Sequence, residues 1–123
     1  MAKPMYVRFE QPNEVTEKVF ALAEAVRESG KMRKGTNEVT KLVERGDALM
    51  VIMAEDVSPE EILAHMPILC EEKGVPYAYI PAKADLGKAA GMEKPTASVA
   101  IIDVGKGKPI LDEIAAAVKA LKQ

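Results

Sequence analysis

The stretch Lys34–Gly46, with the sequence KGTNEVTKLVERG, predicts a short helix with Thr36 or Asn37 as its N-cap and with Gly46 just past its end. Apolar residues recur at helical spacing along one side of this helix: Val39, Leu42 and Val43. The opposite side carries an amide, two carboxylates and two cations: Asn37, Glu38, Lys41, Glu44 and Arg45. One face of the helix therefore fits a protein core, and the other is rich in hydrogen-bond donors and acceptors.

Two interpretations fit the polar face of this helix. It could be a solvated surface whose charges pair with one another, for example Glu38 with Lys41. A binding role is favoured by Gly35, which frees the backbone where the helix begins, and by the unpaired N–H groups of the helix N-terminus, which suit an anion. Asn37 beside Glu38 and one turn before Lys41 also gives a donor and acceptor set that matches a nucleobase edge.

At these residues the sequence resembles the archaeal L-seven-Ae family of ribosomal proteins, which bind kink-turn RNA. The family pattern Gly-x-Asn-Glu-x-x-Lys-x-x-x-Arg-Gly is matched by Gly35, Asn37, Glu38, Lys41, Arg45 and Gly46. The resemblance covers essentially the whole chain. It implies an α/β fold, a three-layer α/β/α sandwich around a small four-stranded mixed sheet. It also implies a noncatalytic RNA-binding protein that needs no cofactor and no metal.

The kink-turn that the resemblance implies is a duplex bent sharply at a bulge beside tandem sheared G·A pairs. A sheared pair leaves the Watson–Crick edge of its guanine free, with an N–H donor beside an oxygen acceptor. Glu38 would accept from the donor, and Asn37 or Lys41 would donate to the oxygen. Flanking cations and the amides of the helix N-terminus would hold phosphates. The predicted RNA-binding residues of this stretch are Lys34, Gly35, Thr36, Asn37, Glu38, Lys41 and Arg45.

The loop within Gly87–Pro95 is the second candidate segment. Met92 is an apolar residue in a polar loop, where it could tuck onto the core edge or face a ligand. In the resembled family this loop holds an apolar, Glu-containing segment against an extruded nucleotide, which assigns Met92, Glu93 and Lys94 to the RNA. Many archaeal members have Ile-Glu-Val here, so Lys94 is expected to add a phosphate contact in place of an apolar one. Lys83 also matches a family RNA contact, although a solvated lysine fits the position equally well.

Helical and strand patterns alternate along the rest of the chain, which predicts a single α/β domain over residues 1–123. An arm over the surface is expected at 1–10. A capping box at 58–61 begins a helix that Pro67 should kink and that ends near Gly74. The other expected helices span 13–29, 84–90 and 110–121, the expected strands span 31–34, 49–54, 75–80 and 98–104, and 105–109 is expected to form a turn.

Composition narrows the class of protein. The 123 residues are 48% hydrophobic, which suits one domain with an ordinary core, and no apolar run is long enough to span a bilayer. A single Cys excludes an internal disulfide and fits the expected location in a reducing cytoplasm. The net charge is −2, yet residues 27–45 carry six cations against three carboxylates. This asymmetry predicts a defined docking face rather than a uniformly cationic surface.

Other candidate chemistry is weaker. His65 and Cys70 are too few for a zinc site and are interpreted as packing residues. Asp56 and Asp103 each follow a strand, where they could act as catalytic acids but are better explained by turns and helix caps. Gly-Lys-Gly-Lys at 105–108 lacks the spacing of a phosphate-binding P-loop. Two further classes stay open: a small enzyme that uses one of the two aspartates, and a protein-interaction module built on the acidic segments 55–61 and 71–72.

The resemblance also implies partners. The RNA would be ribosomal RNA of the large subunit and the guide RNAs of box C/D and H/ACA particles, and ribonuclease P RNA is a further candidate. Assembled guide particles would add a Nop-domain scaffold protein and a fibrillarin-type methyltransferase. The free protein is expected to be a monomer that does not bind membranes.

Overall fold

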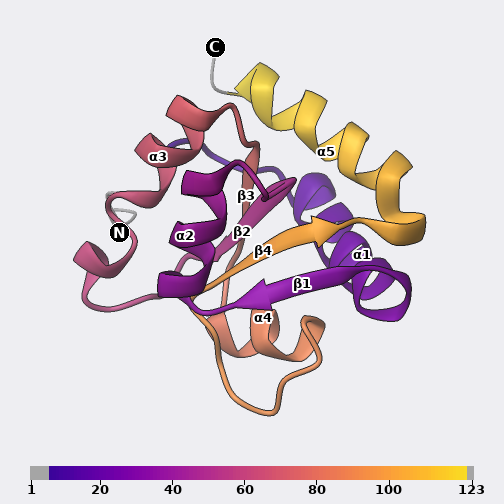
Figure 1. Cartoon of the computed structure of the whole chain (residues 1–123), viewed down its shortest axis with the longest axis horizontal. Coiled ribbons are helices and arrows are strands. Elements are labelled where there is room, and N and C mark those ends of the chain that lie inside the picture. Colours follow the sequence, from indigo (N-terminus) through magenta and orange to yellow (C-terminus); the bar gives the residue numbers. More distant parts are fainter. Residues whose placement is uncertain (1–5, 122–123) are drawn as a thin grey trace.

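The computed structural model describes residues 6–121, in which a four-stranded mixed sheet lies between two layers of helices (Figure 1). The strands are β1 (Lys31–Lys34), β2 (Met50–Ala54), β3 (Tyr77–Ile80) and β4 (Ser98–Asp103), in the order β1-β4-β2-β3. Strands β2 and β3 are parallel, whereas β4 runs antiparallel to both β1 and β2. Strand β2 is buried along its whole length, as a continuous apolar run predicts, and β1 is the exposed edge strand that the sequence indicates.

Helices cover both faces of this sheet, which confirms the predicted α/β/α sandwich (Figure 1). One face carries α2 and α3, and the other carries α1, α4 and α5. The α-helices are α1 (Asn13–Ser29), α2 (Thr36–Arg45), α3 (Met66–Lys73), α4 (Lys83–Ala89) and α5 (Lys108–Leu121), with 3-10 turns η1 (Glu60–Ile62) and η2 (Gly105–Gly107). Helix α1 begins and ends at the predicted residues, and α2 ends before Gly46 as predicted but begins at Thr36, before the start that a cap at Thr36 or Asn37 would give.

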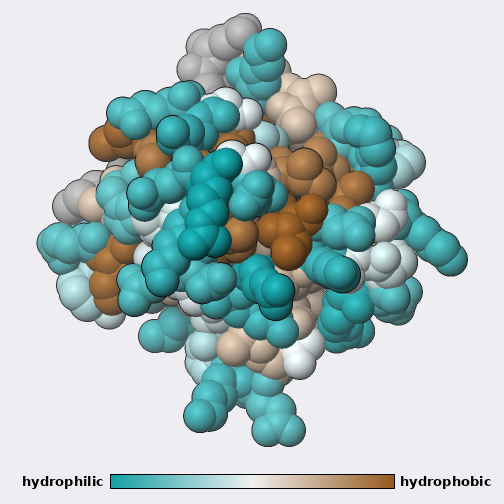
Figure 2. All heavy atoms as spheres, viewed as in Figure 1, coloured by the Kyte–Doolittle hydropathy of each residue, from teal (hydrophilic) through white to brown (hydrophobic). Residues whose placement is uncertain are grey.

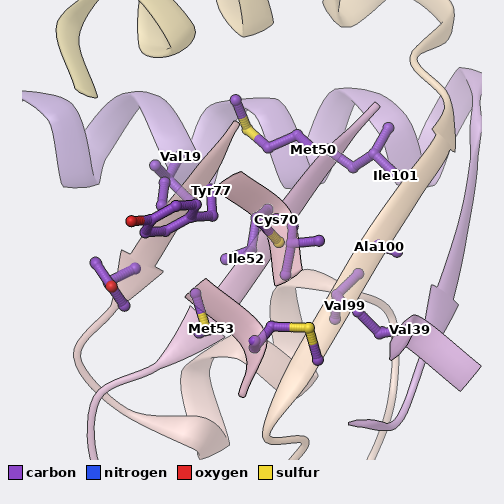
Figure 3. Packing of buried hydrophobic residues seen from close by; sticks show 14 of the residues in the cluster. Val19, Val39, Met50, Ile52, Met53, Cys70, Tyr77, Val99, Ala100 and Ile101 are labelled. Carbon is purple, nitrogen blue, oxygen red and sulfur yellow. The ribbon is translucent and has the colours of Figure 1, made fainter. Parts of the chain in front are cut away.

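The core between the layers includes the first described residue of the chain. Figure 3 shows part of this packing, with Cys70 beside Ile52 of the central strand. Tyr6 is fully buried, its hydroxyl donates to the Ala54 carbonyl (2.6 Å), and the same oxygen accepts from the Val57 amide (3.1 Å). The predicted surface arm is therefore wrong for this residue, because its aromatic ring belongs to the core, and residues 1–5 of the arm lie outside the described residues.

Replacing Tyr6 by phenylalanine should lower the free energy of unfolding by about 1–3 kcal/mol, because two buried backbone groups lose their partner while the ring volume is kept. Burial raises the pKa of the Tyr6 phenol, so the hydroxyl keeps the proton that it donates to Ala54. Urea unfolding of both proteins measures the difference. A loss below about 0.5 kcal/mol would mean that water or another group satisfies Ala54 and Val57 without the phenol.

The segment from Ser58 to Gly74 differs most from expectation. In place of one kinked helix it forms η1 followed by the separate helix α3, and no side-chain cap is made at the predicted capping box. Pro67 lies in the first turn of α3, where its missing N–H costs no helical hydrogen bond, rather than in the middle of a helix. Ile62 of η1 and Ile68 of α3 are 42% and 51% exposed.

Several boundaries shift by one or two residues from the predicted positions. Strand β2 begins one residue late because Leu49 is 44% exposed, and β3 begins two residues late. Helix α4 spans one residue earlier at each end than predicted, and β4 ends one residue early. The predicted turn at 105–109 is a 3-10 turn that leads directly into α5, which therefore begins at Lys108.

Candidate nucleic-acid interface

The N-terminus of α2 is built on Gly35 rather than on a side-chain cap. Gly35 is the N-cap residue with φ = 96°, a backbone conformation that favours glycine, so the predicted cap at Thr36 or Asn37 is wrong. Its amide donates to the Ser98 carbonyl at the start of β4 (3.1 Å). A Cβ atom built at Gly35 would meet no atom within 4 Å, so the space outside the turn is open to a ligand.

Thr96 and Ser98, which were not among the predicted site residues, hold this turn against the sheet. The Thr36 hydroxyl lies 3.2 Å from the hydroxyl of Ser98, and the Thr96 hydroxyl donates to the Ser98 carbonyl (3.2 Å). Thr96 and Ser98 are the buried polar side chains of the described core. The sequence signal for this contact was Ser98, a serine at the start of an apolar run. A hydroxyl in such a run is expected to be buried, and a buried hydroxyl requires a hydrogen-bond partner.

The predicted base-reading side chains lie on the exposed side of α2, which Figure 2 shows as a largely hydrophilic surface. Asn37, Glu38 and Lys41 are exposed, and their side chains form no hydrogen bond or ion pair with any residue between 6 and 121. The Glu38–Lys41 pair that a merely solvated face would contain is therefore not formed. An amide, a carboxylate and an ammonium group stand side by side with their hydrogen-bonding capacity available to a ligand.

A contact with His65 fixes the middle of α2. The Thr40 hydroxyl donates to the Thr36 carbonyl (2.7 Å) and also lies 2.9 Å from Nε2 of His65. Because the hydroxyl has one hydrogen, His65 must be the donor in the second contact. The interpretation of His65 as a packing residue is wrong, since it is exposed and hydrogen-bonded, whereas Cys70 is buried as predicted.

Lys83 is the first residue of α4, which begins one residue before the predicted helix 84–90. Its side chain is exposed, its amide donates to Oδ1 of Asp56 (2.8 Å), and its carbonyl accepts from the Thr96 amide (3.2 Å). The same Thr96 reaches Ser98, so a continuous set of hydrogen bonds joins Lys83 to the N-terminus of α2. This set brings the two segments selected from the sequence to one end of the sheet (Figure 1).

The loop between α4 and β4 is held against the last turns of α4. The Met92 amide donates to the Gly87 carbonyl (2.8 Å). A Cβ atom built at Gly87 would lie only 2.2 Å from the Lys94 carbonyl oxygen, so the absence of a side chain lets the loop pack here. Gly87 of α4 is therefore a positioning residue for this loop.

The side chains of this loop face outward. Glu93 and Lys94 are exposed. Met92 is half-buried, but it is not among the partly buried apolar residues that pack against the described core. This placement favours the interpretation in which Met92 is available to a ligand over the one in which it fills the core edge.

Lys34 and Arg45 lie at opposite ends of this surface. Lys34 is the exposed last residue of β1 and leads directly into Gly35. Arg45 is the last residue of α2, roughly 12 Å along the helix axis from Asn37 at 1.5 Å per residue. We call the surface formed by residues 34–41, Lys83 and residues 92–94 the α2–loop surface, with Arg45 at its far margin.

Asp56 and Asp103, the two candidate catalytic acids, both accept hydrogen bonds from backbone amides. Asp56 caps α4 through Lys83, and Oδ1 of Asp103 accepts from the Gly105 amide (3.0 Å), as the turn and cap interpretation predicts. Among residues 6–121, no three acidic, His or Cys side chains are grouped so that they could hold a metal ion. No helix in that part of the chain is long and apolar enough to cross a membrane.

Comparisons with known proteins identify the family and the fold of this chain. Residues 17–110 match the family model described as the ribosomal protein L7Ae/L30e/S12e/Gadd45 family. Among solved structures, the chain is similar to a 15.5kD RNA binding protein from Giardia lamblia. The two are 34% identical, the match covers 98% of this chain and 99% of that protein, and the TM-score is 0.88.

Proposed function

This chain belongs to the ribosomal protein L7Ae/L30e/S12e/Gadd45 family, and we propose that it recognises kink-turn RNA through the α2–loop surface. The family match and the RNA-binding relative support a noncatalytic RNA-binding protein, in agreement with the prediction that the chain is not an enzyme. The observation that carries the proposal is a set of three side chains, Asn37, Glu38 and Lys41, that have no hydrogen-bond or ion-pair partner among residues 6–121 and lie beside an open, glycine-capped helix N-terminus.

The chemistry of a sheared G·A pair explains why a carboxylate belongs in an RNA-binding face. The guanine edge that such a pair leaves free has an N–H donor next to an oxygen acceptor. Glu38 accepts from the donor, while Asn37 or Lys41 donates to the oxygen, a pair of contacts that a purely cationic site could not make. Met92 and its neighbours pack against the nucleotide extruded at the bulge, because an unstacked base needs an apolar or planar surface to cover it.

An affinity comparison at one fixed salt concentration tests this proposal. One RNA carries a bulge beside tandem G·A pairs, and the other keeps the bulge but replaces those pairs with Watson–Crick pairs. We expect the first RNA to bind at least tenfold more tightly, since each base contact supplies about 1–3 kcal/mol of discrimination. Equal affinity would leave a merely charged patch and would make a protein-interaction role the better explanation.

The Lys34 side chain is expected to contact a phosphate rather than a base. Replacing Lys34 by alanine should therefore weaken binding to the G·A RNA and to its Watson–Crick counterpart by the same factor. It should also lower the slope of log affinity against log salt by about one. Titrations of both RNAs at several salt concentrations measure both effects. A loss confined to the G·A RNA would instead place Lys34 at a base edge.

The same resemblance extends the proposal to ribonucleoprotein particles. We propose roles in the large ribosomal subunit and as a core subunit of box C/D and H/ACA guide particles, with ribonuclease P as a further particle. In guide particles the protein would fix the kink so that a Nop-domain scaffold and a fibrillarin-type methyltransferase can join. Archaeal origin, location in the cytoplasm and a monomeric free state remain predictions.

A groove between α2 and α3 gives the proposed scaffold protein a place to bind next to the RNA. It is lined by Thr40, His65 and Ile68, and Ile62 borders its other end beside Asn37. Figure 2 shows hydrophobic surface over α3, beside the hydrophilic surface of α2. Replacing Ile68 by glutamate should weaken scaffold binding to the protein–RNA complex, measured by native gel shift, and leave RNA affinity unchanged. Equal recruitment by both proteins would move the scaffold contact elsewhere.

A further inference from the structure

A second groove borders the α2–loop surface and is lined by cations without any carboxylate. It lies between the C-terminus of α1, strand β1 and the end of α4, where Ala90 forms one wall. Its charged lining consists of Arg27, Lys31, Arg33 and Lys34, all of them exposed. The groove between α2 and α3 has the opposite character, because Glu44 and Glu72 line part of it. We call the cationic one the β1 groove.

Arg27 is held in place at the rim of the β1 groove. Its guanidinium donates to the Lys88 carbonyl near the end of α4 (3.3 Å). The Arg27 side chain also packs so closely on Gly91 that a Cβ atom there would lie 2.9 Å from Cδ of Arg27. A guanidinium has five N–H donors, so this anchoring leaves donors for an anionic ligand at low further cost in side-chain entropy.

The β1 groove is continuous with the surface that the proposed function uses. Lys34 lines the groove and precedes Gly35, which caps α2. Lys31 lies about 10 Å from Lys34 along the strand, at roughly 3.3 Å per residue, so the positive charge extends away from the base-reading residues. The chain as a whole has a net charge of −2, whereas residues 27–45, which include the groove lining, carry six cations against three carboxylates, so this edge has a local excess of positive charge.

We infer that the β1 groove binds the phosphate backbone of one of the two stems that flank the kink. The inference rests on the proposed function, because the kink places a stem next to Lys34. The lining offers charge and hydrogen-bond donors but no arrangement that would distinguish bases, so it should add affinity and salt dependence without sequence preference. The β1 groove should contact one stem only, since it extends from the α2–loop surface in one direction, along β1 from Lys34.

The test uses the full chain and three RNAs that share one G·A-containing kink: one with short stems, and two in which either stem is lengthened in turn. The groove variant carries Lys31→Gln and Arg33→Gln, and the matched control carries Lys73→Gln and Lys119→Gln, two exposed lysines of α3 and α5. Lengthening one stem, and not the other, should steepen the salt dependence of the wild-type protein and of the control.

The groove variant should lose that gain, with a salt slope lower by roughly 1.5, so that raising salt from about 50 to 200 mM costs it about eightfold less affinity than it costs the wild-type protein. Its preference for the G·A RNA over the Watson–Crick RNA should be unchanged. Thermal unfolding of the two variants confirms that both are folded.

Equal salt slopes for the groove and control variants would overturn the inference. So would a groove variant that loses its G·A preference at an unchanged slope, because the groove would then serve base recognition. An unmutated protein that binds both RNAs equally would refute the proposed function alone, since the slope difference on the long-stem RNA would still report whether the groove binds phosphates. A single Arg27→Gln variant should show about half of the double variant's change in slope.

Discussion

Replacing Glu38 by alanine should weaken binding to a G·A-containing kink-turn by about 1–3 kcal/mol, even though it removes a negative charge from a surface that faces a polyanion. Electrostatics alone predicts the opposite sign, because loss of a carboxylate near phosphates strengthens attraction. The side chain is exposed and has no partner between residues 6 and 121, so its removal costs the free protein little. A loss of affinity can then be assigned to a contact with the RNA.

The matched control for this substitution is Glu44→Ala. Glu44 is exposed on the same helix, roughly 9 Å further along its axis, and carries the same charge. Its removal should leave kink-turn affinity unchanged or slightly improved. Titration of both variants against the G·A RNA and the Watson–Crick RNA separates the effects, since Glu38→Ala should lose affinity only for the first. If both variants bind more tightly than the wild-type protein, the carboxylate does not read a base.

The local pattern of apolar residues was sufficient to predict most of the fold. Val39, Leu42 and Val43 fall on one side of a 3.6-residue repeat, and all three are buried where α2 packs on the sheet. The apolar run of β2 likewise predicted a strand covered on both faces. Such signals are contained within ten residues or fewer, so burial of one face specifies them without knowledge of the rest of the chain.

The contacts that organise the candidate site join residues far apart in sequence, and for this reason local patterns did not predict them. Thr36 meets Ser98 across 62 positions, and Thr40 meets His65 across 25. The cap of α2 was predicted at Thr36 or Asn37, but neither side chain caps the helix. The Thr36 hydroxyl is directed to Ser98, and the positive φ of Gly35 turns the chain instead. Which of several acceptable caps is used depends on what the tertiary structure places nearby.

Local patterns also failed to predict which side chains around Pro67 are buried. Ile62, Met66 and Leu69 recur at helical spacing, yet the chain forms η1 and then a separate helix with Pro67 in its first turn, and this break changes which residues face the core. Ile68 is exposed and Leu63 is buried as a result. The sequence therefore predicted that this region would be helical and apolar, but not that it would leave two isoleucines beside the candidate RNA surface.

Replacing Gly87 by alanine should lower the free energy of unfolding by about 1–3 kcal/mol and weaken kink-turn binding by tenfold or more. Helix propensity alone predicts the opposite, because alanine in a helix interior is favoured over glycine by about 1 kcal/mol. The close approach of the Lys94 carbonyl decides the sign, since a Cβ atom 2.2 Å from a backbone oxygen forces the loop or the helix to move. The displaced loop carries Met92, Glu93 and Lys94 away from the extruded nucleotide.

The matched control is Ala84→Gly on the same helix. Ala84 is exposed, so glycine there should cost about 1 kcal/mol of stability through propensity alone and leave the loop in place. Urea unfolding gives the stability of each variant, and titration below the unfolding range gives its RNA affinity. A marked loss of RNA binding in Gly87→Ala but not in Ala84→Gly would show that the loop geometry, rather than the stability of α4, limits recognition. If Gly87→Ala is stabilising and binds RNA normally, the loop is not held by this contact, and assignment of residues 92–94 to the RNA loses its structural support.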